Sequence, residues 1–165
     1  MPKPNKVYLD TNLVYNWFKL HFTKRRKQAD EEEIIKFLAG HREIECFISA
    51  FTVAEIAANL KNEFKDRITI EQIKYLVGVL QDTINCQIIK FDKFKDMKDQ
   101  DREGILISPE IIKFAFGCLD ASDAIHIGIA KSSDLCFVTR DENVTRVKNI
   151  YENVMGEKKF RKQFD

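Results

Sequence analysis

The chain has 165 residues, of which 44% are hydrophobic, so it is the size of one ordinary domain with one core. Its 27 Lys and Arg nearly balance 26 Asp and Glu, and the net charge is +1. This balance excludes a protein that holds nucleic acid by bulk charge alone, and an acidic disordered chain. No apolar run approaches the roughly 20 residues of a membrane helix, and no apolar signal region follows the first residues. We therefore expect a single domain over residues 1–165, with no membrane association and a cytoplasmic location.

Short apolar runs alternate with longer segments that have helical spacing. The runs predict four strands, at residues 6–9, 44–49, 86–91 and 134–138. The helical spacing predicts helices from Thr11, over 30–40, from Thr52, over 70–80, from Pro109 and over 122–131. This alternation is typical of an α/β domain with a mostly parallel sheet.

For two charged segments the sequence leaves more than one structure open. Residues 92–103 are almost all charged and predict a solvated connector or an exposed helix. Residues 149–164 predict a last strand near 150–154 and a short basic helix. For residues 157–165 a flexible basic tail, an arm that binds a partner and a helix exchanged between two copies all stay open.

The four cysteines, Cys46, Cys86, Cys118 and Cys136, form no C-x-x-C pair, and no histidine lies at zinc-finger spacing. Three of them lie within apolar runs. We expect buried, reduced thiols that pack as small hydrophobic side chains.

Polar residues follow the predicted strands, where ligands bind in a parallel α/β sheet. They are Asp10, Ser49, Thr52, Glu55, Thr139 and Asp141, with Asp120 and Asp123 at the start of the helix before the fourth strand.

Each of these residues also has a purely structural interpretation, as a helix cap. Asp10 or Thr11 would cap the first helix, and Ser122 the helix that carries Asp123. Thr52 to Glu55 and Thr139 to Glu142 both match the capping-box pattern.

Four motifs stand in order along nearly the whole chain: VYLDTN at 7–12, ISAFTVAEI at 48–56, SDAIHIGIA at 122–130 and FVTRD at 137–141. This ordered set resembles the PIN-domain family of metal-dependent ribonucleases. The resemblance implies a three-layer α/β/α fold around a mostly parallel sheet of four to five strands. It also implies that the metal-binding, catalytic acids are Asp10, Glu55, Asp123 and Asp141. Thr11, Asn12 and Thr139 would be supporting polar groups, and Asp120, one turn before Asp123, would supplement or replace it.

The chemistry of phosphodiester cleavage agrees with a set of four carboxylates. Carboxylates brought close together repel one another, and a divalent cation removes that repulsion. Oxygen ligands suit Mg²⁺ or Mn²⁺ rather than zinc. One or two such ions can activate water and neutralise charge on a phosphodiester.

RNA would need cations near the acids. The candidates are Lys24, Arg25, Arg26, Lys27 and Arg140, followed by Lys158, Lys159, Arg161 and Lys162. A solvated helix face is the alternative for these charge runs. Among the aromatic residues near Asp10 we expect Trp17 to pack in the core, and His126 to be a core or interface histidine rather than a base.

We therefore expect a Mg²⁺- or Mn²⁺-dependent endoribonuclease. The resemblance further suggests the toxin of a toxin–antitoxin pair, which implies a homodimer and an antitoxin partner, or a nuclease that processes ribosomal RNA. A non-catalytic PIN-fold module that binds RNA or protein is the main alternative. A dehalogenase-like phosphotransferase would need D-x-D where the chain has Asp10-Thr11-Asn12, and no phosphate-binding glycine motif occurs.

Overall fold

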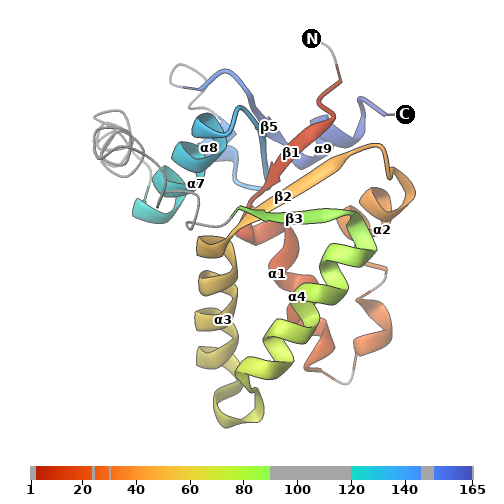
Figure 1. Ribbon diagram of the computed structural model, residues 1–165, viewed down its shortest axis with the longest axis vertical. Helices are drawn as coiled ribbons and strands as arrows, with labels where there is room; N and C mark the ends of the chain where they lie inside the picture. Colours follow the sequence, from red (N-terminus) through yellow and green to blue (C-terminus); the bar gives the residue numbers. More distant parts are fainter. Residues whose placement is uncertain (1–2, 24, 30, 90–119, 146–150, 165) are drawn as a thin grey trace. The chain divides into compact units, whose positions relative to one another are not determined.

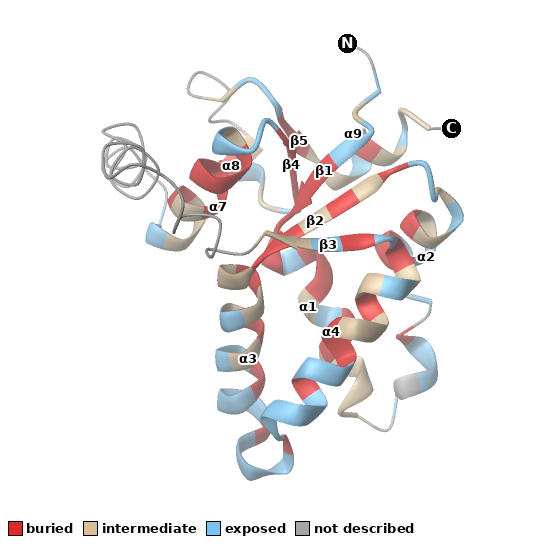
Figure 2. Ribbon diagram, viewed as in Figure 1, coloured by how far each residue is buried: buried red, intermediate tan, exposed pale blue. Residues whose placement is uncertain are grey.

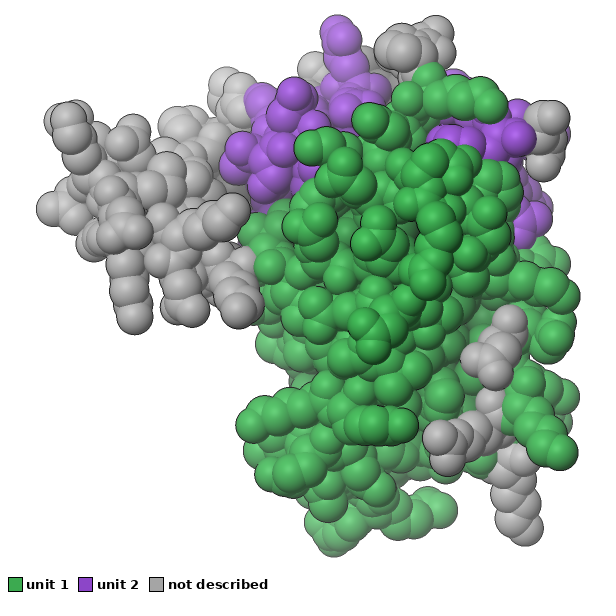
Figure 3. All heavy atoms as spheres, turned by 45° about the vertical axis from the view of Figure 1, so that its right-hand side comes forward, with its two compact units in different colours: residues 1–89 green, residues 90–165 purple. Residues whose placement is uncertain are grey.

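The computed structural model describes residues 3–23, 25–29, 31–89, 120–145 and 151–164. Contacts divide the chain into two compact units, unit 1 (residues 1–89) and unit 2 (residues 90–165), which are coloured separately in Figure 3. The predictions for Lys24, the segment 92–103, the helix at Pro109 and Cys118 lie outside the described residues, as does the side chain of Arg26.

The described residues contain five short strands, in the order β3-β2-β1 within unit 1 and β4-β5 within unit 2. They are β1 (Lys6–Leu9), β2 (Glu45–Ser49), β3 (Cys86–Ile89), β4 (Cys136–Thr139) and β5 (Val154–Gly156). In unit 1, β2 pairs in parallel with both β1 and β3, and in unit 2 β4 pairs in parallel with β5. The predicted α/β fold with a parallel central sheet is confirmed.

The helices of unit 1 lie together on one side of β1, β2 and β3 (Figure 1). They are α1 (Thr11–His21), α2 (Glu33–Gly40), α3 (Ala50–Phe64) and α4 (Ile70–Ile84), with two 3-10 turns, η1 (Arg26–Gln28) and η2 (Lys65–Arg67). Each α-helix buries one stripe of apolar residues, as Figure 2 shows for α3, whose opposite side is exposed. Trp17 is 1% exposed, so its predicted place in the core is confirmed.

Helix α4 continues one turn beyond the predicted end at Leu80. Ile73, Leu76, Leu80 and Ile84 form a single buried stripe, so burial extends the helix. The helix ends where Asn85 takes a left-handed conformation with φ 51°, which asparagine tolerates better than most residues.

Unit 2 contains α7 (Ala121–Ser132), α8 (Glu142–Thr145) and α9 (Glu157–Arg161) together with β4 and β5. The last strand begins at Val154, later than predicted. Before it, the hydroxyl of Tyr151 donates a hydrogen bond to the carbonyl of Leu135. Phe160 is completely buried and packs edge to face on Phe164, which anchors α9.

None of the helices in the described ranges is long and apolar enough to cross a membrane.

The three cysteines of the described residues are buried and reduced, as predicted. Burial raises the pKa of Cys86 to about 12 and that of Cys136 to about 11, and raises the pKa of Cys46 well above its usual value. Cys46 and Cys86 are paired residues of neighbouring strands.

We expect these three thiols not to react with a water-soluble disulfide reagent at pH 8, because thiolate is the reactive form and their raised pKa values keep them protonated. Thiol titration of a Cys118→Ser variant checks this, since that change removes the one cysteine outside the described ranges. The native variant should show no fast-reacting thiol, and the same protein in guanidinium should show three. Fast reaction of the native variant would contradict the burial.

Candidate functional site

Asp10 follows β1 directly and occupies the N-cap position of α1. Its backbone is extended there (φ −63°, ψ 150°), and its carbonyl accepts the first helical hydrogen bond, from the N–H of Leu13. Its carboxylate makes no capping hydrogen bond, although the side chain is only 4% exposed. Capping therefore does not account for an acid at this buried position.

Glu55 lies one turn into α3 and is held by a residue of α1. The hydroxyl of Thr11 donates a hydrogen bond of 2.5 Å to Oε2 of Glu55, across 44 positions of sequence. Thr11 is itself buried and directly follows Asp10. The predicted site residues Thr11 and Glu55 are thus in direct contact between α1 and α3, and Asp10 precedes Thr11 in the chain.

The predicted capping box of Thr52 and Glu55 is wrong. The box is formed one turn earlier, where Oγ of Ser49 accepts from the N–H of Thr52 and Oγ1 of Thr52 accepts from the N–H of Ser49. Strand β2 ends at Ser49, so the helix begins at Ala50. Glu55 therefore takes no part in the cap of α3.

Tyr8 joins β1 to the start of α3. Its buried hydroxyl donates to Oγ of Ser49 at 2.7 Å and lies 3.1 Å from Oγ1 of Thr52. Burial raises the pKa of Tyr8 far above its usual value, and the negative charges of Asp10 and Glu55 raise it further. The sequence did not single out Tyr8, because an aromatic residue in a short apolar strand is typical of a core.

In unit 2, Asp120 is the N-cap of α7. Its Oδ1 accepts a hydrogen bond of 2.9 Å from the N–H of Asp123, so the predicted cap at Ser122 is wrong. Asp120 lies in the better position because α7 begins at Ala121. Asp123 lies in the first turn of α7 with its side chain partly buried.

Thr139 and Asp141 form the turn after β4. The completely buried Thr139 accepts a hydrogen bond of 2.9 Å from the N–H of Asp141. Oδ1 of Asp141 accepts from the N–H of Asn143 at 2.7 Å. Asp141 therefore caps α8 in place of the predicted Thr139–Glu142 box.

The predicted RNA-binding cations have different surroundings. Arg25 and Lys27 are exposed near η1. Arg140 donates from Nε to Oε2 of Glu157 at 2.6 Å, and Arg161 lies 3.6 Å from the same carboxylate. Arg140 is therefore part of an ion-pair network in unit 2.

His126 is 1% exposed and stacks on Phe137 of β4, with ring centroids 6.2 Å apart. The interpretation of His126 as a core residue is confirmed.

The model of the PIN domain matches residues 7–150, which cover most of the chain. The chain belongs to the PIN-domain family. PIN domains are generally nucleases that bind RNA, and they usually use divalent metal ions. A search of curated proteins finds no match.

The acids of this PIN domain can be compared with the ligands that a divalent ion needs. Within the described ranges, no group of three or more His, Cys, Asp or Glu side chains forms a metal site. The donor chemistry does suit Mg²⁺ or Mn²⁺: Asp10 and Glu55 in unit 1, and Asp123 and Asp141 in unit 2, offer only carboxylate oxygens. The buried Asp10 is the acid for which a bound cation would remove the largest desolvation cost.

The two capping boxes of unit 1 differ in burial and so allow a matched test. Thr69 caps α4 in an exposed box with Gln72, so Thr69→Ala should lower the free energy of unfolding by about 1 kcal/mol. Ser49→Ala should lower it by about 2 to 3 kcal/mol, because the buried hydroxyl of Tyr8 also loses a partner. Urea unfolding of both variants measures the difference. Equal losses would contradict the role given to Tyr8.

Proposed function

We propose that the protein is a metal-dependent endoribonuclease that hydrolyses phosphodiester bonds of RNA. Asp10, Glu55, Asp123 and Asp141 are its proposed catalytic, metal-binding acids. The observation that carries the proposal is Asp10, a residue that is 4% exposed at the end of β1 and whose side chain is not used as a cap. Taking a carboxylate out of water costs free energy, and a divalent cation, which PIN domains usually use, would offset that cost at this position.

The chain's own residues have distinct tasks in this proposal. Thr11 orients Glu55 by its hydrogen bond, and Thr139 fixes the turn that carries Asp141. Asp120 caps α7, so the cap of that helix does not use the side chain of Asp123, which is proposed to bind the ion. Bound Mg²⁺ or Mn²⁺ would neutralise charge on the phosphate and lower the pKa of a bound water.

Cleavage of a labelled pool of single-stranded RNA tests the proposal. Wild-type protein should cut in Mg²⁺ or Mn²⁺ and not in EDTA. Asp10→Asn and Asp123→Asn should each lose at least about 100-fold in rate, because removing a metal ligand forfeits several kcal/mol of transition-state stabilisation. Asp141→Asn keeps a side-chain oxygen for the cap of α8. A lower cleavage rate of this variant would therefore be caused by the loss of the negative charge of Asp141 rather than by loss of the cap.

Asp82→Asn is the matched control, since Asp82 is an exposed acid of α4 away from these contacts. It should cut like the wild type. Mn²⁺ titration without RNA gives a second measurement, in which Asp10→Asn should bind the ion more weakly. A folded wild-type protein that binds RNA in Mn²⁺ without cutting it would instead support a non-catalytic binding module.

The resemblance extends the proposal to the toxin of a toxin–antitoxin pair. Such a toxin would act as a cytoplasmic homodimer that an antitoxin holds inactive. Processing of ribosomal RNA is the other role that small family members suggest. Light scattering of the purified protein should give twice the mass of one chain. A monomer at all concentrations would contradict the homodimer and leave the nuclease proposal intact. Growth arrest on expression, relieved by Asp10→Asn, is the result expected of a toxin.

A further inference from the structure

A pocket of about 580 Å³ lies within unit 2, beyond the carboxyl ends of β4 and β5. Thr139 and Gly156, paired residues at the ends of these strands, line it together with Met155. Its volume is within the range of about 300 to 1,000 Å³ that is usual for small-molecule sites. Ligands of parallel α/β sheets bind at this end of the strands.

The pocket is linked directly to one of the proposed catalytic acids. Thr139 lines it, and the hydroxyl of Thr139 accepts the hydrogen bond from the N–H of Asp141. A molecule in the pocket therefore lies against the turn that carries Asp141.

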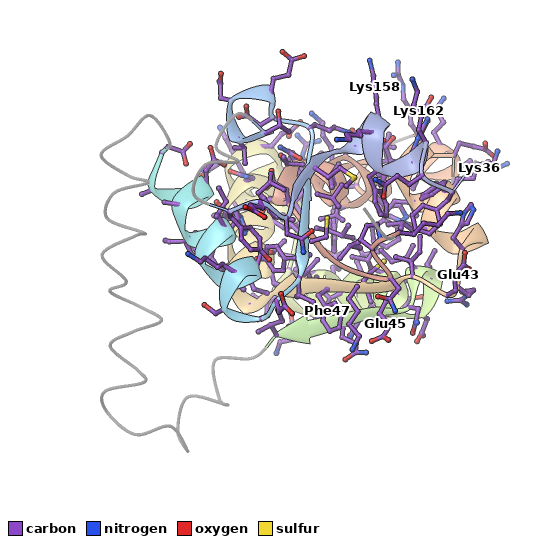
Figure 4. All side chains as sticks on the ribbon, turned by 90° about the horizontal axis from the view of Figure 1, so that it is seen from above. Lys36, Glu43, Glu45, Phe47, Lys158 and Lys162 are labelled. Atoms are coloured by element: carbon purple, nitrogen blue, oxygen red, sulfur yellow. The ribbon has the colours of Figure 1, made fainter. Side chains whose placement is uncertain are left out.

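The pocket is lined by three basic residues, Arg140, Lys158 and Lys159, and by two acidic ones, Glu142 and Glu157. Arg140 and Glu157 neutralise each other through their ion pair. Lys158 and Lys159, in the first turn of α9, also line the pocket, and in the part of the chain that the structure describes neither has a carboxylate partner. Figure 4 shows Lys158 projecting from α9 away from the strands, next to Lys162. The pocket thus combines two available ammonium groups with an apolar wall at Met155.

We propose that this pocket holds one nucleotide of a single-stranded RNA substrate, next to the bond that is cut; this inference rests on the proposed function. Lys158 and Lys159 contact the phosphates, and Met155 and Gly156 contact the base or ribose. Unpaired RNA suits the pocket because an unstacked nucleotide can enter it, whereas a nucleotide in a duplex cannot. The pocket would determine which nucleotide lies beside Asp141.

RNA binding by the inactive Asp10→Asn protein in EDTA tests the phosphate contacts. A fluorescent single-stranded RNA is titrated at several salt concentrations. Lys158→Ala/Lys159→Ala should weaken binding roughly tenfold or more at low salt, and should reduce the salt slope by about 0.7 for each lysine. The matched control is Lys65→Ala/Lys74→Ala, which removes two exposed lysines of unit 1 that do not line the pocket. If both double variants bind alike, the pocket does not hold RNA.

Gly156→Leu tests the shape of the pocket separately from its charge. Gly156 has φ −71°, which any residue adopts, and an added Cβ would lie 3.6 Å from Cγ2 of Thr145, an ordinary contact. The larger side chain should occupy the pocket and weaken RNA binding without changing the salt slope. Unchanged binding by a folded Gly156→Leu protein would contradict a nucleotide at this place.

Failure of this inference is distinct from failure of the proposed function. If the wild type cuts RNA and the two lysine pairs behave alike, the nuclease stands and the pocket assignment falls. If the wild type does not cut but loss of Lys158 and Lys159 alone weakens binding, the pocket stands and the nuclease assignment falls.

Discussion

The buried hydroxyl of Tyr8 is the contact on which the arrangement of unit 1 depends. It bonds to Ser49 and lies within hydrogen-bonding distance of Thr52, the two residues that start α3. A buried hydroxyl without a partner costs about 1 to 3 kcal/mol, so β1 and α3 hold one relative position. Asp10 comes two residues after Tyr8, and Glu55 three residues after Thr52. The same contact therefore fixes the backbone positions of Asp10 and Glu55, the two proposed metal-binding acids of unit 1.

The first four strands were predictable because each is a short apolar run between polar residues, and β1 coincides with its predicted range. The start of α3 was not predictable in the same way. Ser49 and Thr52, and Thr52 and Glu55, have the same three-residue spacing, and the sequence favoured the second pair for its acid. The choice of Ser49 depends on where β2 ends and on the hydroxyl of Tyr8, which lies 41 residues away. Such a long-range contact leaves no local signal.

Long-range contacts also limited the prediction of the cations that would bind RNA. The sequence grouped Arg140 with residues 24–27 as RNA-binding candidates and placed the lysines after Gly156 second. In the structure Arg140 is paired with Glu157, 17 residues later, while Lys158 and Lys159 line a pocket. Whether a surface cation is neutralised depends on which acid the fold brings beside it. The proposed acids Asp10, Glu55, Asp123 and Asp141 could be predicted only from the order of their four motifs, because each acid alone is also a plausible helix cap.

The helix caps of the structure show which of the four proposed acids are used to start a helix and which are not. At α3, Ser49 accepts the capping hydrogen bond from the N–H of Thr52, so Glu55 is not needed there. At α7, Asp120 does the same and leaves the side chain of Asp123 outside the cap. Asp141 does act as a cap, but through Oδ1 alone, so the cap does not use its second oxygen. At α1 Asp10 holds the cap position without the cap bond. Three of the four proposed acids are therefore not used as caps, because the cap at Asp10 is left unmade and Ser49 and Asp120 supply the caps near Glu55 and Asp123.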